Sequence, residues 1–283
     1  MRLIVSTVSH QQGEMIAELG ALASLAAEHD VHVICRDNIA DSSLEEYCQQ
    51  HKIHYVANQE TYGFAKNNNL NFQYYQQHLH PRPDDWFLLL NPDVQLLAET
   101  CTQLKASLAN QQGIVAADLF LGPELTCRDN NLRRYPTLSQ FIKTYLFGDK
   151  STFIDRSLSA PKDIDAWVSG AFLAISCANY QQLGGLDEKY YMYCEDIDLC
   201  YRAQLSGLPV TLDYHIQAIH YRQRASKKMF SRFFFWHVAS VLKFCFLPKA
   251  RQAKKTSLAG HHLAVTSSVH RDRSVELSIK EYH

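Results

Sequence analysis

The 283-residue sequence lacks several features that define common protein classes. Its eight cysteines form no CxxC pair, no apolar run is long enough to cross a bilayer, and the opening "MRLIVSTVSH" has no apolar secretory core. These absences predict a reduced, cytoplasmic protein. The net charge of −1 gives no general attraction for nucleic acid. Apolar and charged contents of 46% and 20% exclude wholesale disorder and a polytopic membrane protein.

The first 120 residues alternate between strand-like and helix-like patterns. Short β-branched or apolar runs predict strands at residues 2–8, 31–35, 52–58, 84–94 and 113–121. Apolar residues at helical spacing predict the intervening helices, at residues 14–29, 42–51 (capped by Ser43), 67–79 and 99–111. This alternation is typical of an α/β domain with a mostly parallel sheet, whose ligands bind at the carboxyl ends of the strands.

The second half is less regular. Residues 122–166 are rich in proline, asparagine and aspartate, with one helix-like run at 138–147. The expected elements beyond them are a strand and short helix within 166–185, a helix from near Ile197 to before Gly207, and strands at 209–220.

The chain divides into three expected parts, residues 1–225, 226–250 and 251–283. The first is the α/β domain, and the last is a basic and polar tail. The middle part is an amphipathic helix that is interrupted too often by charge to span a bilayer. Its apolar surface suits either an anionic membrane or packing against the domain, and consists of Phe230, Phe233, Phe234, Val241 and Phe244.

Three acids stand close together in "YYMYCEDIDLCYR", directly behind a group of tyrosines. Charge at a helix amino terminus and an Asp198–Arg202 pair four residues apart explain Asp198. They do not explain why Glu195 and Asp196 are adjacent, because one capping residue would suffice. A catalytic acid pair is the second interpretation.

A further carboxylate follows the apolar strand of "LLLNPDV". Pro92 stiffens the turn, and Asp93 then lies at the carboxyl edge of the sheet. A carboxylate in this position can hold a divalent cation beside a diphosphate, because Mg²⁺ typically uses one or two protein carboxylates together with phosphate oxygens. An ordinary strand-ending turn is the alternative.

Three other stretches carry polar groups that suit a nucleotide or metal. Asp37 in "ICRDN" can accept hydrogen bonds from a base or begin a turn. In "TYGFAKNNN", Gly63 permits close backbone approach, Lys66 supplies a cation, and the asparagines suit caps or polar contacts. His220 precedes a basic run that begins with Arg222, so it is either a structural histidine or a metal ligand beside cations that neutralise a diphosphate.

The order of these motifs is more specific than any one of them. Asp37, "GFAKNNN", "NPD", "SGAF", "GGLDEKYYMYCEDIDLCYR" and a later histidine together resemble the inverting family 2 glycosyltransferases of the GT-A fold. Within that family the chain is most similar to bacterial rhamnosyltransferase-like members, which build O-antigen and other cell-surface polysaccharides. The resemblance covers residues 1–225.

The resemblance implies a role for each matching residue. Asp196 is the expected general base, with Glu195 beside it, and Asp93 and His220 are the expected ligands of Mg²⁺ or Mn²⁺. The expected nucleotide-sugar residues are Asp37, Asn38, Gly63, Lys66, Asn68, Asn91 and Asp93. The expected acceptor-side residues are Trp167, Ser169, Gly170 and Tyr191. Two departures from the family pattern are Asn91, which replaces the first acid of the DxD element, and "STVSHQQ", where His10 stands in place of the Thr-Tyr-Asn found in many members.

The function implied is transfer of a sugar, L-rhamnose from dTDP-rhamnose, to a saccharide or lipid-linked saccharide acceptor. The alternatives are a transferase that uses a UDP-sugar and a noncatalytic scaffold that has kept the fold. A lipid-linked acceptor also implies peripheral contact with the inner face of the cytoplasmic membrane. No nucleic acid partner is expected.

Overall fold

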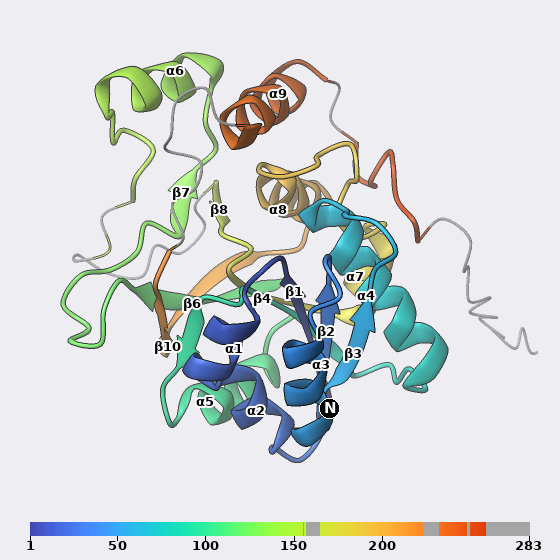
Figure 1. The fold of residues 1–283 in the computed structure, drawn as a ribbon. Helices are drawn as coiled ribbons and strands as arrows, with labels where there is room; N and C mark the ends of the chain where they lie inside the picture. The colour runs from blue at the N-terminus through green and yellow to red at the C-terminus, as the bar shows by residue number, and fades with distance from the viewer. Residues whose placement is uncertain (155, 157–164, 223–231, 248–249, 259–283) are drawn as a thin grey trace, which may run out of the picture.

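A computed structural model describes residues 1–154, 156, 165–222, 232–247 and 250–258 (Figure 1). The strands are β1 (Leu3–Ser9), β2 (Val31–Asp37), β3 (His54–Ala57), β4 (Trp86–Leu90), β5 (Val94–Leu96), β6 (Ile114–Phe120), β7 (Leu132–Arg134), β8 (Ala166–Val168), β9 (Phe172–Ser176) and β10 (Val210–His220). The helices are α1 (Gly13–Leu19), α2 (Ala21–Ala26), α3 (Ser42–Gln50), α4 (Phe64–His78), α5 (Thr100–Leu108), α6 (Leu138–Phe147), α7 (Cys177–Gln182), α8 (Glu195–Leu205) and α9 (Arg232–Phe246).

One eight-stranded sheet forms the centre of the molecule, in the order β3-β2-β1-β4-β9-β6-β10-β5. The strands from β3 to β4 are parallel, as are β6 and β10, which confirms the predicted α/β fold with a mostly parallel sheet. β9 is antiparallel to both of its neighbours and lies between β4 and β6. A separate two-stranded sheet joins β7 to β8.

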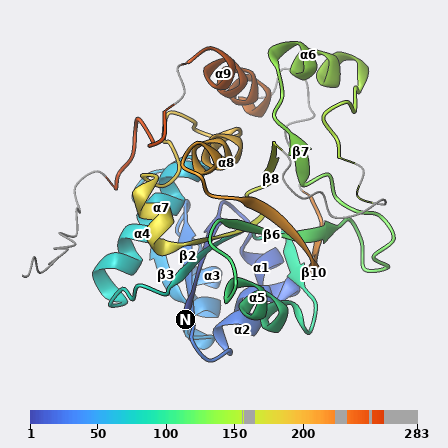
Figure 2. The ribbon, with the colours of Figure 1, turned by 180° about the vertical axis from the view of Figure 1, so that it is seen from behind.

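Helices cover both faces of the sheet (Figures 1 and 2). Alternate residues of each strand point to opposite faces, so Leu3 and Val5 pack with α1, α2, α3 and α5, whereas Ile4 packs with α4, α7 and α8. Two hydrophobic cores result, one on each face. The helices α6 and α9 lie side by side at one end of the molecule, beyond the carboxyl ends of β1, β2 and β4.

Several helices begin or end at other residues than predicted, for reasons of local conformation. The helix expected over residues 14–29 is two helices, because Gly20 adopts a left-handed conformation with φ 64° and ends α1. Asp41, not Ser43, caps α3 by accepting from the backbone N–H groups of Ser43 and Leu44. The helix α4 begins at Phe64, three residues before the predicted start, after an extended Gly63.

Four buried asparagines attach α4 to its surroundings. Successive helical residues are turned about 100° from one another, so neighbouring side chains reach different elements. The contacts made are Asn67 with the Tyr62 carbonyl, Asn68 with the Ser6 hydroxyl, Asn69 with the Leu186 backbone, and Asn71 with Ser6 and Arg36. The expectation of polar contacts for the run Asn67–Asn69 is therefore confirmed.

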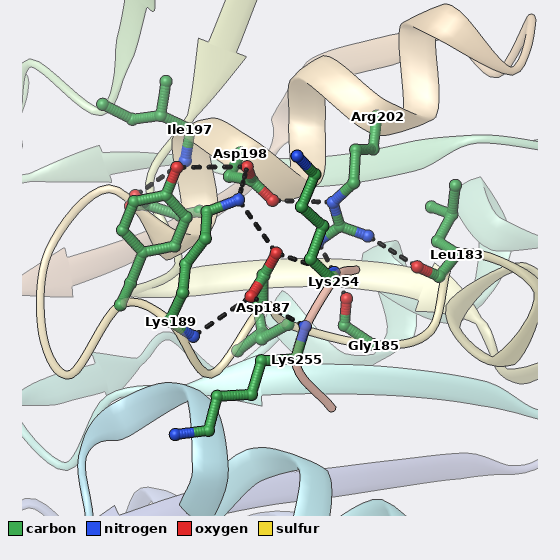
Figure 3. Close-up of polar contacts among 12 residues, drawn as sticks. Leu183, Gly185, Asp187, Lys189, Ile197, Asp198, Arg202, Lys254 and Lys255 are labelled. Atoms are coloured by element: carbon green, nitrogen blue, oxygen red, sulfur yellow. Dashed lines mark hydrogen bonds and ion pairs between the residues drawn. The ribbon is translucent and has the colours of Figure 1, made fainter. Parts of the chain in front are cut away.

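A network of buried charges fixes α8 (Figure 3). Arg202 donates to Asp198 at 2.6 Å, as the four-residue spacing predicted, and also to the carbonyls of Leu183 and Gly185. Lys189 bridges Asp198 and Asp187, at 3.1 Å and 2.8 Å. The turn before α8 is thereby bound to the helix itself.

The C-terminal segment, residues 250–258, returns to the domain. The backbone N–H groups of Lys254 and Lys255 donate to the Asp187 carboxylate (Figure 3), and Ser257 donates to Glu188. Leu258 is buried in the core beneath α4 and α7. Residues 251–258 of the predicted polar tail therefore pack against the domain, whereas residues 259–283 lie outside the described part of the chain.

Replacing Asp187 with Asn is expected to lower the free energy of unfolding by about 2–3 kcal/mol at neutral pH, because the largely buried Lys189 loses one of its two carboxylate partners. Burial alone would raise the Asp187 pKa, but hydrogen bonds from Lys189 and from the Lys254 backbone lower it overall. A lowered pKa contributes stability above the unfolded carboxyl pKa and loses it as the pH falls through the folded pKa.

Urea unfolding of wild type and Asp187→Asn from neutral to acidic pH tests this expectation. The difference in stability should shrink as the pH falls below the ordinary carboxyl range. Asp84→Asn, which removes a surface pair with the amino terminus, is the control and should cost less than about 1 kcal/mol. A difference that stays constant down to the acid limit contradicts the role of the charge.

Candidate functional site

A cavity of about 850 Å³ opens at the carboxyl edge of the sheet. Its walls come from the segments after β1, β2, β4 and β6, from the turn before β9, from the start of α8, and from α6 and α9. The antiparallel β9 begins at this edge because its first residue, Phe172, pairs with Leu90 at the end of β4. The position agrees with the general rule for ligand sites in α/β sheets.

Strand pairing brings together the two residues that the sequence predicted as metal ligands. The antiparallel pairing of β5 and β10 sets Val94 opposite His220, and the Tyr221 N–H donates to the Asp93 carbonyl at 3.0 Å. As a result, His220 Nε2 lies 3.3 Å from Asp93 Oδ1 at the cavity wall. The predicted pair is therefore adjacent although 127 residues separate its members in sequence.

The opposite nitrogen of His220 contacts a residue that the sequence did not indicate. Nδ1 lies 2.7 Å from Asp129 Oδ2, and Asp129 also pairs with Arg222. Asp129 lies in the irregular stretch after β6, where no strand or helix pattern assigns its side chain a direction. In the sequence, only the polar run "RDNN", which contains Asp129, indicates a turn at this position.

Asn38 and Asn91 also line the cavity. Asn38 Oδ1 accepts from the Tyr62 N–H at 3.0 Å, which joins the segment after β2 to the start of α4. The Asn91 N–H donates to the Ala171 carbonyl at 2.9 Å, which joins the "NPD" turn to the "SGAF" segment. His10 lies at the cavity wall near this side.

Four predicted nucleotide-sugar residues do not line the cavity. The buried carboxylate of Asp37 accepts from the Tyr55 hydroxyl and from the Asp41 N–H. Lys66 lies over the Tyr62 ring, and Asn68 is bonded to Ser6. A Cβ atom at Gly63 would collide with the Tyr191 carbonyl, which accepts from the Phe64 N–H. In this structure all four contact other parts of the protein and not the cavity.

The three adjacent acids occupy three different environments. Asp198 is buried in the ion network of α8. Asp196 lines the cavity, where Oδ2 accepts from the Gly170 N–H at 3.1 Å and Oδ1 from the Ile197 N–H at 2.8 Å. Glu195 is buried, and its Oε2 finds no hydrogen-bond partner among the residues that the structure describes.

These environments shift the pKa values of the two neighbouring carboxyls, Glu195 and Asp196, to different extents. Burial raises the pKa of Glu195 well above its ordinary value, and the negative charge of Asp196 raises it further. Burial raises the pKa of Asp196 overall, and hydrogen bonds from the Gly170 and Ile197 backbone and the nearby cation of Arg133 offset only part of that effect. Like charges in contact resist double ionisation, and the stronger upward shift of the pKa falls on Glu195. Of the two carboxyls, Asp196 therefore ionises more readily, and it lines the cavity.

An unusual backbone leads into α8. Tyr193 and Cys194 both adopt left-handed conformations, with φ 71° and φ 67°, which residues with a Cβ adopt at a cost of about 1–3 kcal/mol each. The turn that they form directs Glu195 inward and Asp196 toward the cavity.

The side of the cavity where an acceptor was expected is aromatic. Trp167, Ser169, Gly170 and Tyr191, the four predicted acceptor-side residues, all line the cavity. The structure adds side chains from α6 and α9 that the sequence analysis did not assign to the site. Tyr191 stacks on Trp236 at 4.5 Å between ring centroids, and His237 lies between Tyr193 and Phe141.

The donor set fits a divalent metal held partly by substrate. In the described residues, no group of three or more His, Cys, Asp or Glu side chains is arranged to hold a metal by itself. A carboxylate and an imidazole are suitable when diphosphate oxygens and water supply the other ligands. Mn²⁺ accepts an imidazole more readily than Mg²⁺, which prefers oxygen.

Replacing Glu195 with Gln is expected to stabilise the protein increasingly as the pH rises. A raised folded pKa gives stability that is complete below the unfolded pKa and is lost as the pH rises toward the folded value. Above the ordinary carboxyl range, the free energy of unfolding of wild type should therefore decrease relative to that of Glu195→Gln by up to about 1.4 kcal/mol per pH unit.

Urea unfolding between pH 5 and pH 8 measures that slope. Exposed Glu45, in the first turn of α3, provides a matched Glu→Gln control. Equal pH dependence of wild type and Glu195→Gln would contradict a proton on Glu195.

Comparison with known proteins identifies the family. The sequence matches no protein-family model. It is 30% identical to rhamnosyltransferase WbbL of Escherichia coli K12, over 93% of this chain and 97% of that protein. It is 25% identical to the N-acetylglucosaminyl-diphospho-decaprenol L-rhamnosyltransferase of Mycobacterium tuberculosis, over 99% of this chain and 98% of that protein.

Solved structures agree on the fold. A mannosyltransferase of Pyrobaculum calidifontis, in complex with GDP-mannose and Mn²⁺, superposes with a TM-score of 0.52 and 14% identity over 79% of this chain. Staphylococcus aureus TarS 1-349 superposes with a TM-score of 0.52 and 13% identity over 78%. This chain spans 58% and 60% of those two chains. Taken with the extent of the match to rhamnosyltransferase WbbL, the chain belongs to the rhamnosyltransferase-like family 2 glycosyltransferases, enzymes that transfer glycosyl groups in polysaccharide biosynthesis.

Proposed function

We infer that this protein is an inverting transferase that moves L-rhamnose from dTDP-rhamnose to a lipid-linked saccharide. The observation that carries the proposal is Asp196, whose carboxylate is held by two backbone N–H groups on the aromatic side of the same cavity whose other side contains Asp93 and His220. Both rhamnosyltransferase relatives support the choice of sugar, and the decaprenol-linked acceptor named for one of them supports the choice of acceptor.

In this mechanism Asp196 accepts the proton of the acceptor hydroxyl. Its two backbone hydrogen bonds hold the carboxylate in position, and the neutral Glu195 behind it adds no second charge. The hydroxyl oxygen attacks the anomeric carbon from the face opposite the nucleoside diphosphate, and the bond to the diphosphate breaks. A base in position contributes about 10²–10⁴-fold to the rate.

Asp93 and His220 are the residues that would hold Mg²⁺ or Mn²⁺. The ion supplies Lewis-acid stabilisation of the charge on the leaving diphosphate. Arg222, at the same wall, adds a side-chain cation on that side. The stacked Tyr191 and Trp236 offer flat apolar surface to a sugar ring on the acceptor side.

The proposed membrane contact uses a different face of α9 from the one predicted. Val241 and Phe244 are buried against Tyr190 and Ile197, so this part of the predicted surface packs inside the protein. Phe230 and the side chain of Phe233 lie outside the described residues, and Phe234 is half-buried. The exposed apolar residues of α9 instead follow helical spacing on its outer face, at Phe235, Val238, Leu242 and Phe246.

The neighbouring helix α6 also carries exposed apolar residues. Ile142, Leu146 and Phe147 are exposed on α6, and Phe147 is 80% exposed. Both helices border the cavity, so a bilayer at this surface would lie beside the acceptor side. In the described residues no helix has the length and apolar character needed to cross a membrane. The exposed apolar residues of α6 and α9 support the proposal of peripheral contact with the inner face of the cytoplasmic membrane.

Asp196→Asn is expected to lower the transfer rate by about 10²–10⁴-fold while the donor still binds, because the amide keeps the shape of the side chain but cannot take a proton. Turnover is measured with dTDP-rhamnose and a prenyl-diphosphate-linked sugar. Donor binding is measured as thermal stabilisation, since a ligand that binds only the folded state raises its stability.

Glu195→Gln is the adjacent matched variant and should lose much less rate, because it mimics the protonated acid. Retained turnover in Asp196→Asn excludes this residue as the base. If UDP-sugars raise the melting temperature and dTDP-rhamnose does not, the donor is a UDP-sugar. If no nucleotide raises the melting temperature in Mg²⁺, Mn²⁺ or EDTA, the protein is a noncatalytic scaffold.

The double variant Phe235→Glu/Phe246→Glu is expected to weaken binding to vesicles of phosphatidylethanolamine and phosphatidylglycerol by at least about 10-fold, because burying each ring contributes about 1.5–3 kcal/mol. The two side chains are 58% and 68% exposed, so the melting temperature should be unchanged. Vesicle flotation measures the binding.

Leu205→Glu, at an exposed apolar residue that ends α8, is the control. It should float like wild type. Absence of wild-type flotation, or equal loss in Leu205→Glu, contradicts contact through α9.

A further inference from the structure

We propose that Asp129 is a positioning residue that presents His220 to the divalent metal of the donor site. The inference rests on the proposed function, because it concerns the metal that Asp93 and His220 would share. It adds a residue that neither the motifs nor the resemblance assigned to the site.

The two oxygens of Asp129 have different partners. Oδ2 lies 2.7 Å from His220 Nδ1, and Oδ1 pairs with Arg222. An ionised carboxylate only accepts hydrogen bonds, so the Nδ1 atom of His220 must carry a proton. Nε2, which faces Asp93 at 3.3 Å, is then the nitrogen available to a cation.

The position of Asp129 is itself fixed by the end of β6. Its N–H donates to the Leu119 carbonyl at 2.7 Å, and its carbonyl accepts from Arg156, which also pairs with Asp118. The side chain is 1% exposed. A rigid and dry carboxylate of this kind can hold an imidazole ring in one orientation.

The contact between Asp129 and His220 resembles the usual surroundings of a metal-bound histidine. Metal-bound histidines usually donate their other N–H to a carboxylate, which fixes the tautomer and makes the ligating nitrogen more basic. Loss of such a partner typically weakens metal affinity 10- to 100-fold. Asp129 also pairs with Arg222, so a single carboxylate orients both groups that would face the diphosphate.

The test is Mn²⁺ binding by the full chain in the presence of dTDP, followed by the electron paramagnetic resonance signal of free Mn²⁺. Asp129→Asn is expected to bind Mn²⁺ 10- to 100-fold more weakly than wild type. Asp129→Glu keeps the charge that neutralises Arg222 but shifts the oxygen away from Nδ1, so it should fold and still lose at least 10-fold.

Asp85→Asn is the matched control. Asp85 is equally buried and pairs with Arg2, but it precedes β4, away from the cavity. This variant should melt at a lower temperature and bind Mn²⁺ like wild type, which separates metal affinity from general stability.

The outcomes distinguish the inference from the proposed function. If wild type binds Mn²⁺, Asp93→Asn loses binding, and both Asp129 variants bind like wild type, only the positioning role is overturned. If wild type with dTDP binds no Mn²⁺, the metal site of the proposed function fails, and the role of Asp129 fails with it. If Asp85→Asn and Asp129→Asn lose Mn²⁺ affinity equally, the loss results from lower stability, and the inference is also overturned.

Discussion

The buried pair between Asp198 and Arg202 is the interaction on which the acid side of the cavity depends. It fixes α8 to the turn at Leu183 and Gly185, and Lys189 extends the same network to Asp187. With the helix held, its first turn cannot move away from the Gly170 N–H that binds Asp196. Removing charges from water is costly unless they are fully paired, so this network explains how Asp198, one of the three neighbouring acids, can be buried.

The cavity has two chemically distinct sides because two kinds of chain segment build it. Strands of the central sheet and the segments after them supply the polar side, where the antiparallel pairing of β5 and β10 brings His220 to Asp93. The aromatic side comes from the segment before α8 and from two helices at one end of the molecule, α6 and α9. Under the proposed function, the constant chemistry of a diphosphate would suit the first kind of construction, whereas a variable acceptor would suit the second.

The sequence predicted the features that depend on local pattern. Alternation revealed the α/β fold, four-residue spacing revealed the Asp198–Arg202 pair, and motif order revealed the family. It failed where distant contacts decide. No local signal inserts β9 antiparallel between β4 and β6, or aims Asp129 at His220 across 91 residues. Helical periodicity also found apolar residues in α9 but could not tell which face would be covered by Tyr190 and Ile197.

The return of the chain at residues 250–258 has a mechanical consequence. Ser240 and Lys243 of α9 donate to the carbonyls of Met192 and Lys189, and the segment that follows the helix is bound to Asp187 and Glu188. Contacts on both sides therefore fix the orientation of α9 relative to the domain. Any surface on which its outer face rests would therefore set both the height and the tilt of the cavity, and would limit which hydroxyl of a membrane-bound glycan can reach Asp196.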